Sequence, residues 1–348
     1  MRPSPSWLSP KKRRQLLRSS NHSMFTPATR ASRHDSSAPA RSFVQRLRTG
    51  DEAAFLITLV CAASIVVITV LLVVELYSAS AASRHRFGWS FLFSRTWDPV
   101  AGDFGALAFI YGTLVTSALA LLLAVPLGVG AAIFLAELAR RRVSDYLTFL
   151  IELLAAVPSV IYGLLAIFVL VPILRTIEPG LRAVLGFLPL FQGPFYGVSL
   201  FSAGVVLAIM IVPFIISISR EVLLAVPLEQ REGALALGAT KWESTWQVVV
   251  PFARTGIIGS IFLALARALG ETMAVTMVIG NQPAINTSLF APGYSIAAVI
   301  ANEFTEATGD LYISALIQLG LVLFALTMII NAAARLLILA TEKKGARR

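Results

Sequence analysis

Residues 231–251 read REGALALGATKWESTWQVVVP, a polar and amphipathic stretch that lies between two long apolar segments. Pro227 suits the first turn of a helix, where its missing N–H costs nothing, and Gly238 suits the left-handed position that ends one. We therefore expect a short helix at about 228–241 and a second helical piece over 241–249. By periodicity alone, such a helix could lie passively on the lipid surface or contact another protein.

The composition of the chain indicates a polytopic membrane protein. Of its 348 residues, 57% are hydrophobic and 14% are charged, which leaves little room for a soluble domain. A spanning helix needs about 20 mostly apolar residues to cross a hydrocarbon layer that is roughly 30 Å thick. We predict an all-α protein with a transmembrane domain over 53–342 and six spanning helices, at about 55–76, 107–135, 149–174, 198–219, 255–280 and 313–340.

The distribution of charge predicts the orientation of these helices. The net charge is +10, and Lys and Arg concentrate in the N-terminal tail, in alternate loops and at the C-terminus. The intervening loops carry few bases, and the loop at 281–312 carries Glu303, Glu306 and Asp310 instead. Because basic loops favour the cytoplasmic side, we expect both termini and the 231–251 stretch to be cytoplasmic.

The two ends of the chain are basic. Residues 1–52 are rich in Ser, Pro and Arg, and they contain too few apolar residues to offset the entropy of ordering, so we predict a disordered cytoplasmic tail near anionic lipid. A nucleic-acid or regulatory role for the tail is the less favoured alternative. Residues 343–348 are expected to form a basic cytoplasmic C-terminus. The chain has one cysteine, Cys61, and three scattered histidines, which offer no disulfide or metal framework.

The spacing within 231–251 distinguishes lipid contact from protein contact. The tripeptide Glu-Gly-Ala at 232–234 is followed after three residues by Gly238, and after nine more by Val-x-Val-Pro at 248–251. This spacing resembles the EAA loop of ABC importer permeases, with departures only to small or β-branched residues. The resemblance implies the type I ABC importer permease fold, in which this helix docks into a groove of a separate ATPase subunit. It places the following residues at that contact: Glu232, Gly233, Ala234 and Gly238.

Nucleotide binding is expected on another polypeptide. The sequence contains no G-x-x-x-x-G-K-[ST] phosphate loop. We therefore expect a transport subunit rather than an enzyme, with no cofactor of its own and with ATP and magnesium held by the partner ATPase.

Two charges lie inside the fifth apolar run, Arg267 and Glu271. Because a charge at the bilayer centre costs roughly 2.5 to 3.5 kcal/mol, the pair requires a reason. On one continuous helix the two side chains share a face and can form an ion pair. They lie on a stripe of small residues that predicts close packing against other helices: Gly256, Ser260, Ala264 and Ala274.

Two interpretations of these charges remain open. The pair could be a structural ion pair that fixes helix packing. Alternatively, Arg267 contacts a transported oxyanion, for which its planar guanidinium is suited, and Glu271 positions or releases that anion. The charges do not identify the substrate, since phosphate, sulfate, molybdate or tungstate would all suit them.

A resemblance extends over about residues 55–340 and includes residues 264–281, ALARALGETMAVTMVIGN. This stretch resembles the fifth-span signature of phosphate-specific ABC permeases of the PstC type. The resemblance implies a permease subunit that translocates inorganic phosphate across the bacterial cytoplasmic membrane. The implied partners are a homologous second permease, a dimer of ATPase subunits, an extracytoplasmic phosphate-binding protein and membrane lipid, with no nucleic acid.

Two alternative functions are considered. Within transport, the chain could be an ABC permease for another oxyanion. From a different class, a proton-driven secondary carrier would transport without an ATPase and would fail when the proton gradient collapses.

Overall fold

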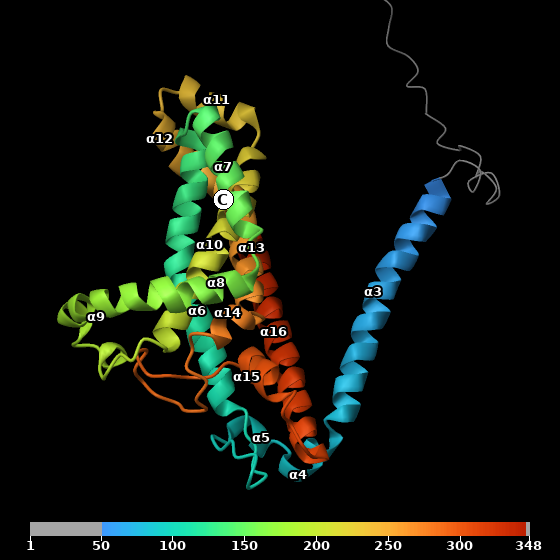
Figure 1. Cartoon of the computed structure of the whole chain (residues 1–348). Coiled ribbons are helices and arrows are strands. Elements are labelled where there is room, and N and C mark those ends of the chain that lie inside the picture. Colours follow the sequence, from blue (N-terminus) through green and yellow to red (C-terminus); the bar gives the residue numbers. More distant parts are fainter. Residues whose placement is uncertain (1–50, 346–348) are drawn as a thin grey trace, which may run out of the picture. The chain divides into compact units, whose positions relative to one another are not determined.

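The computed structural model describes residues 51–345. The predicted disordered tail therefore lies outside the described residues except for residues 51 and 52, which begin α3 (Asp51–Ala79). Residues 346–348 of the predicted basic C-terminus also lie outside them. The chain divides into two units, residues 1–66 and 67–348, and the following description concerns the second unit unless α3 is named. Within the described residues the elements are helices, and no β-sheet forms (Figure 1).

Six helical segments of the described chain are long and apolar enough to cross a membrane, which confirms the predicted number. The first is Ala54–Ala79 in α3, and the second is Leu107–Leu138, made of α6 (Leu107–Ile133) and η1 (Phe134–Leu138). The third is Ser159–Leu185, made of α8 (Ser159–Leu165), η2 (Ala166–Leu170) and α9 (Val171–Leu185), and the fourth is α10 (Leu200–Leu224). The fifth is Lys241–Leu269, made of α12 (Lys241–Ser244), η4 (Thr245–Val249) and α13 (Val250–Leu269), and the sixth is Asp310–Leu336 in α16 (Asp310–Gly345). The segments η1, η2 and η4 are π-helical.

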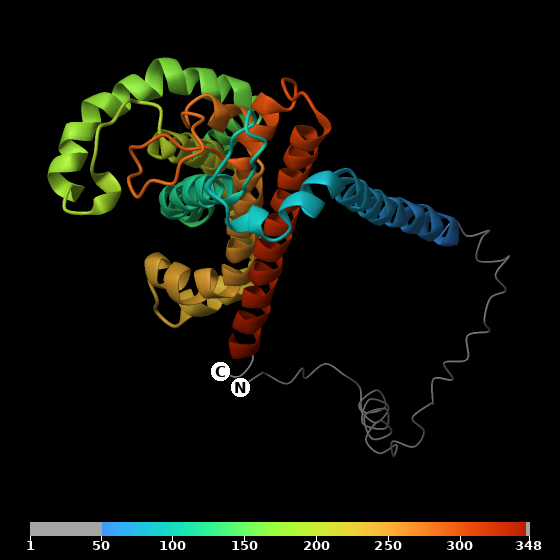
Figure 2. The same ribbon diagram turned by 90° about the horizontal axis from the view of Figure 1, so that it is seen from below.

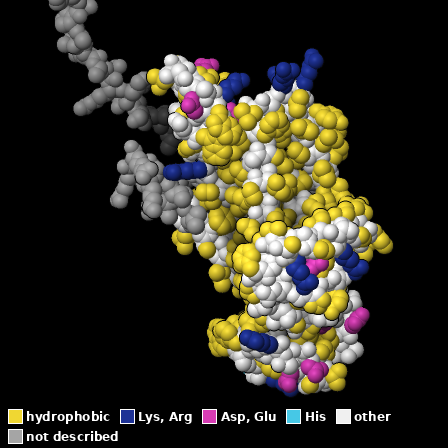
Figure 3. All heavy atoms as spheres, turned by 90° about the vertical axis from the view of Figure 1, so that its left-hand side faces the viewer, with side chains coloured by type: hydrophobic (Ala, Val, Ile, Leu, Met, Phe, Trp, Pro, Cys, Tyr) yellow, Lys and Arg dark blue, Asp and Glu magenta, His cyan; other side chains and the backbone are white. Residues whose placement is uncertain are grey.

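Shorter helices connect these segments. They are α4 (Ala81–Phe87), α5 (Ser90–Phe93), α7 (Arg141–Ala155), the 3-10 turn η3 (Pro189–Phe191), α11 (Leu228–Ala236), α14 (Met273–Thr276) and α15 (Ile296–Glu303). Figure 3 shows one face of the molecule, on which hydrophobic side chains cover most of the upper and middle part. Charged side chains gather at its top and in its lower part, as expected for a surface that faces lipid.

The third span begins later than predicted. The apolar run suggested a helix over 149–174, but α7 ends at Ala155 and a new helix starts at Ser159. Pro158 stands between them as the N-cap of α8, with φ −58° and ψ 140°. Because proline disfavours a helical conformation in the residue before it and cannot donate a backbone hydrogen bond, it ends α7 here. The corrected apolar segment is Ser159–Leu185.

This corrected segment runs in a different direction from its neighbours. Figure 1 shows α8 and α9 crossing the direction of α6 and α10 rather than lying along them. In the view from below in Figure 2, the same helices curve around the loop at 281–292. The loop is attached there by the hydroxyl of Ser288, which donates to the carbonyl of Gln192.

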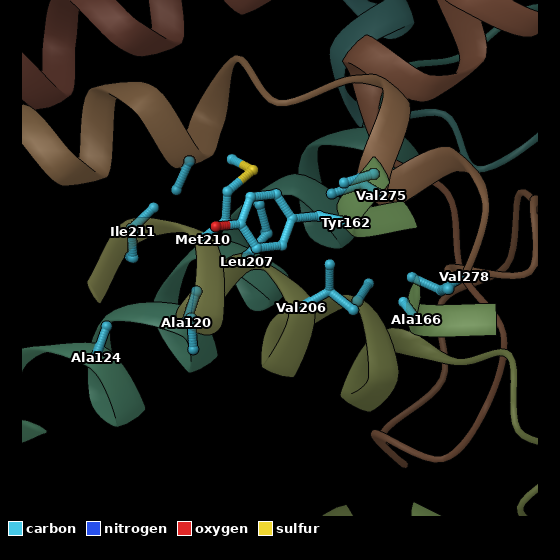
Figure 4. Close-up of a cluster of buried hydrophobic side chains, with 14 of the residues drawn as sticks. Ala120, Ala124, Tyr162, Ala166, Val206, Leu207, Met210, Ile211, Val275 and Val278 are labelled. Carbon is cyan, nitrogen blue, oxygen red and sulfur yellow. The ribbon is translucent and has the colours of Figure 1, made fainter. Parts of the chain in front are cut away.

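The core of the second unit forms where α6 and α10 pack along one another and α8 and α14 cover them. Figure 4 shows the side chain of Tyr162, from α8, in the middle of apolar side chains such as Leu207 and Met210 from α10 and Val275 from α14. The Tyr162 hydroxyl has a hydrogen-bond partner in this apolar setting, since it donates to the carbonyl oxygen of Leu154 at 2.7 Å. Burial of this surface holds α8 and α14 against the α6–α10 pair.

Close packing at Gly112 of α6 gives a first prediction. A Cβ atom at this position would lie 2.1 Å from the carbonyl oxygen of Tyr294, a backbone atom that cannot move aside easily. Gly112→Ala should therefore lower the free energy of unfolding by about 1–3 kcal/mol, as overpacking does. Thermal unfolding of the purified protein in detergent measures this loss.

Gly130 provides the matched control, because it lies on the same helix and a Cβ there would meet no atom within 4 Å. Gly130→Ala should leave stability unchanged or raise it by up to about 1 kcal/mol, since alanine loses less backbone entropy. Equal destabilisation by both substitutions would show that Gly112 is not a packing constraint.

A polar cluster closes the end of the unit that carries α15. The carboxylate of Glu303 accepts hydrogen bonds from the indole N–H of Trp97 at 2.8 Å and from the hydroxyl of Tyr312 at 2.7 Å. Nearby, the Tyr294 hydroxyl accepts from the amide of Asn302, and burial raises the pKa of Tyr294 to about 12. One carboxylate thus joins the loop before α6, the end of α15 and the start of α16.

Candidate functional site

The helix α11 lies at the other end of the unit, beside α12 and η4 (Figure 1). It begins after Pro227, which adopts φ −55° and ψ 140° as the N-cap, and it ends at Ala236 rather than at the predicted 241. Gly238 has φ +91°, the left-handed conformation that suits glycine and ends a helix. The chain turns at Gly238, and Thr240, two residues later, is the N-cap of α12.

That N-cap starts the route back into the apolar segment. The Thr240 hydroxyl accepts from the backbone N–H of Glu243 at 3.2 Å, and the Glu243 carboxylate accepts from the Thr240 N–H at 2.8 Å. This reciprocal pair is a capping box, which satisfies two donors at a helix start. From Lys241 the helix continues through η4 into α13, so α11 is connected to the fifth span by one short turn.

Large apolar side chains are exposed on and beside α11 and α12, among charged side chains such as Glu229 and Lys241. Leu237 is 91% exposed and Trp242 is 54% exposed, and the rings of Trp242 and Trp246 contact each other at 5.5 Å. We refer to the exposed apolar residues here as the docking face: Leu228, Leu235, Leu237, Trp242 and Trp246. Grouped exposure of large apolar side chains is typical of a surface that binds a protein or a membrane.

The four residues predicted to make the ATPase contact lie around this docking face. Glu232, Gly233 and Gly238 are exposed, and Ala234 is half-buried. A Cβ atom at Gly233 or Gly238 would meet no atom within 4 Å, so both positions are open to a partner. Their role in that contact remains a prediction.

An ion pair that the sequence did not indicate ties α11 to the second span. Arg231 Nη2 lies 3.0 Å from Glu137 Oε1 of η1, without the alignment of a hydrogen bond, and the two side chains are only 17% and 12% exposed. The same guanidinium donates to the carbonyl oxygen of Leu223, near the end of α10, at 2.6 Å. One side chain therefore links the amphipathic helix to the ends of both α10 and the α6–η1 segment.

Removal of Arg231 gives a second prediction. Arg231→Ala leaves the Glu137 carboxylate partly buried without its partner, so the free energy of unfolding should fall by about 3 kcal/mol. The double variant Glu137→Ala/Arg231→Ala should lose less than the sum of the two single variants. Thermal unfolding in detergent measures all of these variants.

The ion pair between Arg220 and Glu221, at 2.9 Å, is the control, because its acidic partner is 68% exposed whereas Glu137 is 12% exposed. Because Glu221 is largely exposed, Glu221→Ala should change stability by no more than about 0.5 kcal/mol. Additive losses for Glu137 and Arg231 would contradict a coupled pair.

The small-residue stripe of the fifth span packs against α10, as its spacing predicted. The hydroxyls of Ser260 and Ser219 lie 2.7 Å apart across this interface, and Ala264 is fully buried. A Cβ atom at Gly256 would lie 2.3 Å from Cγ1 of Val222. The helix backbones therefore come close together along this face.

Arg267 follows the same stripe near the end of α13. Its side chain is exposed in the chain, and its guanidinium carbon lies 5.9 Å from the ring centroid of Phe214 in α10, within cation–π distance. The ring of Phe214 lies on one side of the guanidinium. The N–H edge of a guanidinium is the part that can donate hydrogen bonds to an oxyanion.

Glu271 does not share a helix with Arg267, which corrects the predicted pairing. The helix was expected to run over 255–280, but α13 ends at Leu269, and Gly270 follows as its C-cap. The Glu271 carboxylate instead accepts from the N–H of Ala274 at 3.3 Å, at the start of α14. Among the described residues, Arg267 and Glu271 do not form an ion pair. The break at the glycine separates the two charges that a continuous helix would align.

The family of this chain follows from comparison with known proteins. A family model described as the inner membrane component of binding-protein-dependent transport systems matches residues 124–342. This match covers more than half of the chain, and the chain belongs to that family. Its members are transport components, in agreement with a predicted transport subunit.

The relatives define the subfamily more narrowly. The chain is 50% identical over 290 residues to the phosphate transport system permease protein PstC of Mesorhizobium japonicum, which covers 81% of this chain and 89% of the relative. It is 38% identical over 293 residues to a probable PstC of Methanocaldococcus jannaschii, covering 82% and 92%. An inward-facing structure of the MetNI methionine ABC transporter has a TM-score of 0.49 and 15% identity, covering 71% of this chain and 99% of that chain.

Proposed function

We propose that this chain is the permease subunit of an ATP-driven importer of inorganic phosphate. The observation that carries the proposal is the 50% identity, over four fifths of the chain, to a relative that is named as a phosphate transport permease. Arg267 supplies a guanidinium suited to a tetrahedral oxyanion. The charge of Arg267 would suit sulfate or molybdate as well, and the relatives' names favour phosphate over them.

The family of the chain and its docking face support the proposed partners. The docking face and the residues Glu232, Gly233, Ala234 and Gly238 contact an ATPase subunit, which holds ATP and magnesium. A homologous permease completes the path for the anion, and an extracytoplasmic binding protein delivers phosphate. Both termini and α11 face the cytoplasm of a bacterial cell, and the six spans lie in its cytoplasmic membrane, as the distribution of basic residues favours.

Coupling in this proposal runs through two connections of α11. ATP binding moves the paired ATPase subunits together, and this motion displaces α11. The displacement reaches the fifth span through α12 and η4, and it reaches α10 and the α6–η1 segment through Arg231. In this proposal, the ATP-bound ATPase dimer binds one conformation of the permease, through α11, more tightly than the other. This difference in affinity shifts the population of permease conformations.

The central experiment is purification of the full chain in mild detergent, followed by reconstitution into vesicles with the proteins that copurify. A second six-span permease and an ATPase with a phosphate loop should copurify. Phosphate uptake should require ATP on the side of the vesicle membrane that carries the ATPase. Excess sulfate or molybdate should not compete. Uptake without an ATPase that stops on addition of a protonophore would instead establish a secondary carrier.

A further inference from the structure

A groove runs along α16 on the side that faces the end of α3, α4 and α5. Its walls are mostly apolar, and the following residues line them: Leu92, Leu321, Val322, Ala325, Leu326 and Ile329. All of these residues belong to the second unit of the chain. The polar groups of the groove, the side chains of Arg84 and Gln318, are at one end along the α16 axis.

The wall formed by α4 is held in place by buried hydrogen bonds. The backbone N–H of Ser83 donates to the hydroxyl of Ser314 at 3.1 Å, and that hydroxyl donates to the carbonyl oxygen of Ala79 at 3.1 Å. The Ser83 hydroxyl donates to the amide oxygen of Gln318. Because these bonds join α4 to α16 directly, the groove exists before any ligand binds.

The length of the groove matches one leaflet of a bilayer. From Gln318 to Ile329 the helix rises about 16 Å at roughly 1.5 Å per residue. Half of a hydrocarbon layer of roughly 30 Å is about 15 Å. The groove therefore extends from the level of α4 to about the middle of the apolar layer, which is the depth that one acyl chain occupies.

A positive charge stands at the mouth of this groove. The guanidinium of Arg84 lies 3.5 Å from the ring centroid of Tyr77, and it donates to the carbonyl of Tyr77 at 2.6 Å and to the Ser80 hydroxyl at 3.1 Å. These bonds go to neutral oxygens and occupy two of its five N–H donors. In the described part of the chain, no carboxylate forms an ion pair with Arg84.

The aromatic residues around Arg84 place it at the membrane surface. Tyr77 is near the end of the first apolar segment, and Trp89 is 81% exposed. Both line the groove, and tyrosine and tryptophan are enriched where acyl chains meet head groups. The charge is therefore at head-group level, while the apolar part of the groove is at acyl-chain level.

We propose that this groove binds an anionic phospholipid, with one acyl chain along α16 and the phosphate held by Arg84. An anionic lipid supplies both an apolar chain of the required length and a negative charge at the required end. A transmembrane helix of a partner protein would fill the apolar part but would require a carboxylate of its own to neutralise Arg84.

The test measures lipid binding to the purified, delipidated full-length chain by native mass spectrometry. The probes are phosphatidylglycerol and phosphatidylcholine with identical acyl chains. The unaltered chain should bind phosphatidylglycerol more tightly, and Arg84→Gln should reduce this preference by about tenfold, since a hydrogen-bonded charge contributes an amount of that order. Arg86→Gln is the matched control, because Arg86 does not line the groove, and it should keep the preference.

A second pair of variants tests the acyl-chain part of the groove. Ala325→Trp fills the groove and should abolish the binding of both lipids at this site, whereas Ala332→Trp, at an exposed position of the same helix outside the groove, should not. Equal affinity for the two lipids in the unaltered chain, or an unchanged preference in Arg84→Gln, would overturn the proposal. So would an Ala325→Trp variant that retains its lipid but no longer copurifies with a partner permease, because the occupant would then be a protein helix.

Discussion

Replacing Arg267 with alanine should lower phosphate uptake by about 100-fold while the chain still inserts and assembles. The expected size follows from the loss of charge-assisted hydrogen bonds to the anion, each worth roughly 1.5–3 kcal/mol. Assembly should persist because the Arg267 side chain is exposed and its guanidinium lies beside the ring of Phe214. Radiolabelled phosphate uptake by reconstituted vesicles measures the loss, and copurification with the partners measures assembly.

Two further variants make this result specific. Arg267→Lys keeps the charge but loses the planar pair of donors, so it should retain part of the uptake. Arg335→Ala removes an exposed arginine from the far part of α16 and should leave uptake unchanged. Full uptake in Arg267→Ala would exclude this residue from the anion path and would leave a structural role as the remaining interpretation.

Reversing the charge of Glu232 should uncouple ATP hydrolysis from transport. Glu232 is exposed on α11, so Glu232→Arg leaves the fold intact and places a repulsive charge at the proposed ATPase contact. Phosphate uptake should fall at least about tenfold, since misplaced charges at an interface cost several kcal/mol. The ATPase activity of the assembly should persist without stimulation by phosphate loaded on the binding protein.

Gly238→Pro should have the same effect through the backbone. Proline fixes φ near −65°, whereas Gly238 has φ +91°, so the turn between α11 and α12 cannot keep its course. Asp145→Arg serves as the control for both variants, because it reverses an exposed charge on α7 at the same end of the unit. Normal uptake in Glu232→Arg and Gly238→Pro would show that the ATPase contact lies elsewhere.

The amphipathic helix was predictable because its ends depend on local chemistry. A proline can precede a helix, and a glycine can end one with positive φ; the capping box of Thr240 and Glu243 is a further local signal that was not among the predictions. Each signal involves residues that are neighbours in sequence, and α11 begins after Pro227 and α12 after Thr240. The number of apolar segments was predictable for a similar reason, since it depends only on composition over a window of residues.

The ends of the third and fifth apolar segments were not predictable from hydropathy. Apolar runs lie on either side of Pro158, and the apolar run that ends at Leu269 resumes at Met273 after Glu271 and Thr272, so the mean hydropathy of a window conceals both breaks in the backbone. The pairing of Arg267 with Glu271 depended on an unbroken helix and failed with it. Pro158 was a visible signal for the first break, but a proline within a span can also merely kink it.

The ion pair between Glu137 and Arg231 was missed for a different reason. Its members are far apart in sequence and meet only when η1, the end of α10 and α11 are brought together. Arg231 was visible as one of the basic residues that indicate orientation, and that role does not require a partner. Phe214, below the Arg267 guanidinium, was likewise one apolar residue among many in its span.

The two segments that α11 contacts, η1 and η4, are π-helical, and this conformation allows a change of helical register. A π-turn contains one residue more than an α-turn, so a helix can take up or release that residue and shift by about 1.5 Å without unwinding. Arg231 of α11 forms an ion pair with Glu137 of η1, and α11 packs on η4. In the proposed coupling, a displacement of α11 would enter each span at a π-turn, where the helical register can change.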